Sequence, residues 1–205
     1  SATRTDLCAE AERLARLLAQ LQPDPETSGL LALMLLPGAA FGQSPEDIAR
    51  ITELAGQFAT VTENSDMAGS LEMLPPTLID SISAQMNVTR DEYIGHMIQA
   101  ASQNASLVSV RSVTLDTDAM TWHEAPDGSS YALIPTLSVV EISDTPGGPR
   151  STVVQEVSQT LALRDRGEWH LVRLGSDQQQ DNIRMAFPAL YDQDFPLPQI
   201  EEVTQ

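Results

Sequence analysis

The strongest constraint on the fold is a change in hydrophobic period close to Ala105. Before this point apolar residues recur every three or four positions, which is the spacing of amphipathic helices. After it, apolar residues alternate with Ser, Thr and Gln in runs that are separated by turn dipeptides. This order predicts an α+β fold in which N-terminal helices pack on one face of a curved antiparallel meander sheet.

Three helices are predicted between residues 44 and 105. The first begins after Ser44, because the sequence Ser-Pro-Glu-Asp supplies an N-cap, a proline at the first helical position and acids in the first turn. A polar break at residues 64–70 separates it from a second, shorter helix that follows the prolines at 75–76. A capping box at residues 89–92 opens the third helix.

Turn residues divide the second half of the chain into strands. Asp127 and Gly128 predict a tight turn, and Arg166 and Gly167 predict another. The predicted strands cover residues 107–115, 131–142, 153–163 and 169–174. Pro135 lies within one of them and marks a bulge or a sheet edge, since proline cannot donate to the ladder. A last helix follows, capped by Ser176 with Gln179.

This pattern divides the chain into three parts. Residues 1–43 form a helical hairpin or a signal-derived leader, and residues 44–195 form the α+β domain. Residues 196–205 are an acidic tail that is expected to wrap the surface or fray.

Two interpretations of residues 1–43 stay open. Apolar residues at helical spacing, interrupted by prolines at positions 23 and 25, predict a hairpin over residues 5–36 and a cytoplasmic protein. The apolar run at residues 30–36 and the small residues after it are typical of a secretory signal peptide, which would place the protein in the periplasm or outside the cell. Asp24 and Glu26 stand where a signal carries positive charge.

Over residues 44–195 the order and lengths of the predicted elements resemble the nuclear transport factor 2-like fold, also called cystatin-like. In that fold helices pack into the concave face of a strongly bent sheet. The resemblance implies such a cone for about three quarters of the chain. It leaves the function open, since the fold hosts isomerases, dehydratases, cyclases and non-catalytic binding or dimerisation modules.

A second resemblance covers residues 3–36. The segments Asp-Leu-Cys-Ala-Glu-Ala at 6–11, Arg-Leu-Ala-Arg-Leu-Leu at 13–18 and Pro-Asp-Pro-Glu at 23–26 precede the apolar run at 29–36. Together they are similar to a helical hairpin found after the DNA-binding region of some extracytoplasmic-function sigma factors. No helix-turn-helix precedes the segment in this sequence and the chain is strongly acidic, so the resemblance implies a hairpin rather than a sigma factor.

Charge narrows the range of partners. The formal net charge is -18, with 29 acidic residues against 11 basic ones. A chain this acidic repels phosphates, so we expect no binding to nucleic acid and no docking on anionic membranes. The apolar run at residues 30–36 is too short to span a bilayer.

The sequence contains no complete catalytic or metal-binding motif. The three histidines lack ligand spacing, the acids after residue 115 depart from a calcium-loop pattern, and Cys8 stands alone, so no metal and no cofactor are expected. The best candidates for lining a pocket are residues with acid, base or aromatic side chains. They are Tyr93, His96, Asp116, Asp118, Trp122, His123 and Tyr131.

These observations favour a non-catalytic module that binds a small apolar ligand or a partner protein, as a homodimer. The alternative is a small lyase or isomerase that uses a pocket carboxylate with Tyr93, Tyr131 or His123. That alternative requires a deep pocket in which an Asp or Glu lies beside one of these side chains. A regulatory fragment related to sigma factors is a third possibility, which the charge disfavours.

Overall fold

The computed structural model describes residues 44–105, 107–145 and 151–203. From Pro45 onward these residues form one compact unit. Cys8 and both interpretations of residues 1–43 fall outside the described residues.

Helices come first in this unit, as the sequence predicts. They are α3 (Pro45–Glu63), α4 (Met67–Glu72), α5 (Pro76–Gln85) and α6 (Arg90–Asn104). The capping box at the start of α6 is confirmed, because the Thr89 N–H donates to Glu92 Oε2 over 2.8 Å and the Glu92 N–H donates to Thr89 Oγ1 over 3.3 Å. The Glu92 carboxyl accepts hydrogen bonds from the Thr89 N–H and the Thr89 hydroxyl, and these two bonds lower its pKa.

Helix α4 overlaps residues 64–70, which the sequence predicts to be a polar break. Asp66 caps it by accepting a hydrogen bond of 3.0 Å from the Gly69 N–H. Leu71 on this helix is buried. Helix α4 has six residues, which is too few to show a helical period. The polar composition of residues 64–70 therefore gave no sign of a helix.

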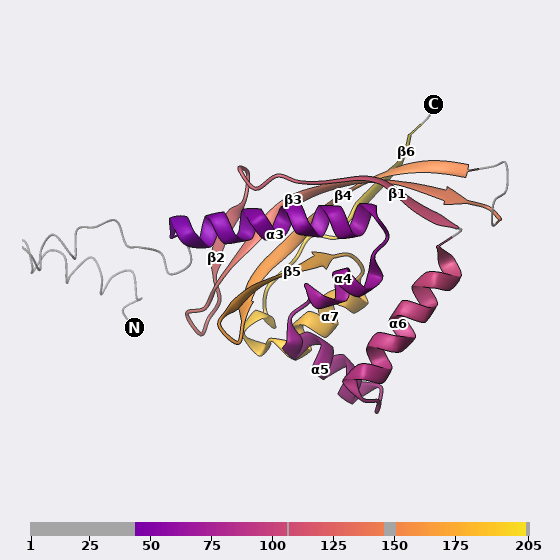
Figure 1. Cartoon of the computed structure of the whole chain (residues 1–205). Coiled ribbons are helices and arrows are strands. Elements are labelled where there is room, and N and C mark those ends of the chain that lie inside the picture. The colour runs from indigo at the N-terminus through magenta and orange to yellow at the C-terminus, as the bar shows by residue number, and fades with distance from the viewer. Residues whose placement is uncertain (1–43, 106, 146–150, 204–205) are drawn as a thin grey trace, which may run out of the picture. The chain divides into compact units, whose positions relative to one another are not determined.

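A six-stranded antiparallel sheet follows the helices, with β1, β3, β4 and β5 in that order across it. The strands are β1 (Val108–Leu115), β2 (Thr121–Glu124), β3 (Ser130–Ser143), β4 (Ser151–Asp165), β5 (Glu168–Leu174) and β6 (Gln199–Glu202). The sheet curls into a half-barrel, with α3 lying along it and with α5 and α7 (Asp177–Ala186) packed near β5 (Figure 1). The predicted α+β order, helices followed by a curved antiparallel sheet, is confirmed.

Pro135 lies in a central strand but at a local edge. β1 ends opposite Thr136 and β2 begins to pair with β3 only at Leu133, so Pro135 faces the gap between them. The bulge lies in β1 instead, where the register shifts between Val110 and Ser112. A proline costs no ladder hydrogen bond in such a gap.

Helices cover both faces of the sheet at β4 and β5, not one face as expected. Residues 160–163 of β4 are all buried, which requires cover on both sides. Ala162 and Leu171 pack against α3, in a cluster that contains Ile51 and Phe58. The alternate residues of the same strands form a second cluster with α5 and α7, whose members include Leu78, Leu161, Val172 and Ile183.

The C-terminal segment is part of this sheet. β6 pairs antiparallel with β4, with Ile200 opposite Glu156. Residues 199–202 of the predicted tail therefore pair with β4 beyond the end of β5. Among the helices that the structure describes, none has the length and apolar character needed to cross a bilayer.

Candidate functional site

A cavity of about 590 Å³ lies where α6 approaches α3, α4 and α5 beside the end of β5. Most of its wall is apolar. The apolar and aromatic side chains that line it are Phe58, Met67, Leu71, Leu74, Leu78, Ile82, Met86, Tyr93, Met97 and Val172. Its volume falls in the range of small-molecule sites, about 300–1,000 Å³.

Helix α6 forms one wall of the cavity with few buried side chains of its own. Tyr93, 8% exposed, is its one buried hydrophobic residue among the described side chains. Met97 is half-buried and also faces the cavity. The helix is therefore well capped at its start but loosely packed along its length. Segments with few buried contacts are the ones that open most readily in a folded protein.

The opposite end of the cavity is polar. It is formed by Arg173 at the end of β5 and by the first turns of α7, which contribute Ser176, Gln178, Gln179 and Asn182. The α7 capping box holds this corner in place, since Ser176 and Gln179 exchange hydrogen bonds of 3.2 and 3.4 Å. The lining residues that the structure describes include no Asp and no Glu.

Of the sequence-predicted site residues, Tyr93 lies in this cavity. Burial raises the pKa of its hydroxyl, so the group is neutral at physiological pH. His96, one turn along the same helix, is exposed and is not part of the lining. Asp116 and Asp118 lie in the exposed loop after β1, where Asp116 Oδ1 accepts a hydrogen bond of 3.1 Å from the Ala119 N–H.

The remaining candidates lie on β2 and β3, away from the cavity lining. The rings of His123 and Tyr131 stack with centroids 5.1 Å apart, and Trp122 meets Trp169 edge-on at 5.7 Å. The Tyr131 hydroxyl donates to Gln193 Oε1 over 2.8 Å, and burial raises its pKa. The structure thus brings His123 and Tyr131 together but separates them from Tyr93.

A second hollow, of about 660 Å³, places Tyr131 near a carboxylate, that of Asp127. This carboxylate accepts hydrogen bonds of 2.9 Å from the Ser129 N–H and 2.6 Å from the Ser129 hydroxyl. These bonds lower the pKa of Asp127, which makes it a weaker base. A general base near neutral pH needs the opposite shift.

Sequence reasoning missed most of the cavity lining. Met67 and Ser70 lie in the stretch expected to be a break, and Arg173 lies in a strand without a motif. One signal was present, because Met67, Met86 and Met97 all line the cavity and methionine suits adaptable apolar sites. No group of three or more His, Cys, Asp or Glu placed to hold a metal ion occurs among residues 44–105, 107–145 and 151–203.

Comparison with protein families finds a match at the N-terminal part of the chain. Residues 1–75 match the model of a family of unknown function, DUF6596. The matched stretch includes α3 and α4 but not α5, α6, α7 or the sheet, so it covers one part of the cavity wall. No curated protein and no solved structure matches the chain.

Proposed function

We propose that this protein binds a small apolar molecule in the cavity between α6 and the β5–α7 corner. The observation that carries the proposal is the lining itself, an apolar wall with most of its polar side chains at the β5–α7 corner. Pockets that bind small molecules have this composition, since apolar contact supplies affinity and a few polar groups fix orientation.

The energetics favour a ligand that buries several methylene groups in the cavity. Each buried methylene contributes about 0.8 kcal/mol. A chain of eight methylenes would gain roughly 6 kcal/mol, before the entropic cost of binding is subtracted. Met67, Met86 and Met97 can adopt alternative rotamers around such a chain.

We also propose that the domain that holds this cavity has the nuclear transport factor 2-like fold. Helices that precede a curled antiparallel sheet support this relation. The second helical layer on β4 and β5, formed by α5 and α7, departs from a simple cone with helices on its concave face.

The cavity predicts a specific effect of filling it. Met97→Trp should weaken binding of the neutral fluorophore N-phenyl-1-naphthylamine at least about tenfold, because the indole would occupy space that the ligand needs. Met185→Trp is the matched control, since Met185 on α7 is 51% exposed and does not line the cavity. Fluorescence titration of both variants measures the effect. Equal affinity of the Met97 variant and the unmodified protein would refute the site.

The proposal includes a homodimer. On directly paired positions of β3 and β4, Leu137 and Val157 are 39% and 50% exposed, and they leave apolar surface on one face of the sheet. We expect light scattering at tens of micromolar to give twice the monomer mass, and Val157→Glu to shift the population toward monomer. A monomer mass for the unmodified protein would remove this part of the proposal.

A further inference from the structure

The proposed cavity is chemically asymmetric, and its one charge is positive. Arg173 is the only charged residue among the described residues that line it. Arg173 therefore stands at the β5–α7 corner of a largely apolar space, within a chain whose formal net charge is -18.

Arg173 is held in position from outside this cavity. Its Nη2 lies 2.5 Å from Glu156 Oε1, and the two side chains are 30% and 16% exposed. Glu156 lines an adjoining hollow of about 490 Å³, which shares Arg173, Ser176 and Gln179 with the main cavity. The carboxylate thus holds the guanidinium through one of its nitrogens, at a residue that borders both hollows.

The guanidinium has unused hydrogen-bonding capacity. Its Nε is buried and has no hydrogen-bond partner among the described residues. A guanidinium carries five N–H donors in a planar fork, so one carboxylate does not exhaust them. A buried donor without a partner costs free energy. A ligand oxygen that changes the packing at this end of the cavity and accepts a hydrogen bond from Nε would recover that free energy.

We infer that the ligand is an amphiphile with an apolar chain and one terminal carboxylate, with the carboxylate at Arg173 and the chain along α5 and α6. This inference rests on the proposed function and names its ligand class. The hydroxyl of Ser176 and the amide of Asn182 line the same end and can donate to the second carboxylate oxygen.

Two sources of negative charge disfavour an anion at this position, the net charge of the chain and the carboxylate of Glu156. The net charge acts at long range and is screened within about 8 Å at physiological salt. Glu156 acts at short range, because it already neutralises part of the guanidinium. Removing the negative charge of Glu156 should therefore strengthen carboxylate binding, while binding of a neutral ligand should not change.

The experiment compares decanoate with 1-decanol, which share a chain and differ in charge. Each is titrated against the full chain by displacement of N-phenyl-1-naphthylamine at fixed pH and salt. The unmodified protein should prefer decanoate about threefold, and Glu156→Gln should raise this preference to about tenfold or more. In the double variant Glu156→Gln/Arg173→Gln, which leaves no unpaired charge at this position, the ratio of decanoate affinity to 1-decanol affinity should fall to about one.

The outcomes separate the inference from the proposed function. If neither compound displaces the fluorophore, the proposed function fails. If both bind equally and the affinities of the variants do not change, the carboxylate inference is wrong and the cavity proposal stands. Should the double variant fail to fold, the single Glu156→Gln variant still decides, because it retains Arg173 and must favour decanoate more than the unmodified protein does.

Discussion

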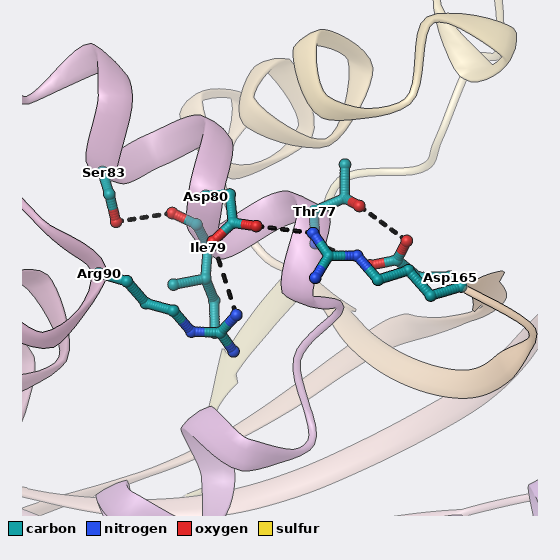
Figure 2. Close-up of polar contacts among 7 residues, drawn as sticks. Thr77, Ile79, Asp80, Ser83, Arg90 and Asp165 are labelled. Carbon is teal, nitrogen blue, oxygen red and sulfur yellow. Dashed lines mark hydrogen bonds and ion pairs between the residues drawn. The ribbon is translucent and has the colours of Figure 1, made fainter.

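Replacing Asp165 with alanine is expected to lower the free energy of unfolding by about 2–3 kcal/mol, the range for hydrogen bonds to a buried charged group. Asp165 is 6% exposed and lies at the end of β4. Its two carboxylate oxygens each accept a hydrogen bond of 2.7 Å from Thr77, one from the backbone N–H and one from the hydroxyl. Figure 2 shows this carboxylate beside the first turn of α5.

The effect is large because α5 has no cap of its own. Its N-cap is Pro75, which makes no side-chain cap hydrogen bond, and Pro76 follows at the first position. The N–H groups of a first helical turn need acceptors from elsewhere. Asp165 supplies one from 88 residues away and fastens the β4–β5 turn to the helix. Without it, the Thr77 N–H would lose its acceptor in a partly buried place.

Asp127→Ala is the matched control for Asp165→Ala. Asp127 accepts the same pair of hydrogen bonds, from the N–H and hydroxyl of Ser129, but it does so two residues away and in an exposed turn. We expect its loss to cost less than about 1 kcal/mol. Urea unfolding followed by circular dichroism measures both variants. Similar small losses in the two variants would show that Asp165 does not fasten α5.

Local signals explain why much of the fold could be predicted from the sequence. The capping boxes of α6 and α7 involve residues three apart, and the structure contains both pairs of hydrogen bonds. The turn at Gly128 needs the positive φ of 85° that glycine adopts freely. Each of these features depends on neighbours in the chain, so the sequence is enough to identify them.

The cavity could not be predicted in the same way, because its wall comes from distant parts of the chain. Phe58, Tyr93 and Val172 line it from α3, α6 and β5. The candidates chosen from the sequence were selected by side-chain chemistry, and the structure distributes them over α6, a loop and β2–β3. Only Tyr93 among them faces the cavity. Long-range packing decides which face of an amphipathic helix borders a cavity and which borders a filled core.

Phe58→Ala should lower the stability of the protein, and a ligand bound in the cavity should partly restore it. Phe58 is 7% exposed, belongs to the cluster between α3 and the sheet, and lines the cavity. Its truncation should lower the free energy of unfolding by about 3–5 kcal/mol. It should also enlarge the cavity, so a saturating neutral apolar ligand such as 1-decanol should recover part of the loss by binding the folded state alone.

Phe195→Ala is the control for Phe58→Ala, because it removes a buried phenyl ring at a position away from the cavity. Phe195 is 6% exposed and packs in the other cluster, edge-on to Tyr131 at 6.3 Å, and it does not line the cavity. We expect a comparable loss of stability, but the increase in melting temperature on adding 1-decanol should equal that of the unmodified protein. For Phe58→Ala the increase should be larger. Differential scanning calorimetry measures the increase in melting temperature for the unmodified protein and both variants. Equal increases in all three would mean that the ligand does not bind beside Phe58, because only a ligand in that cavity contacts the space that the phenyl ring leaves.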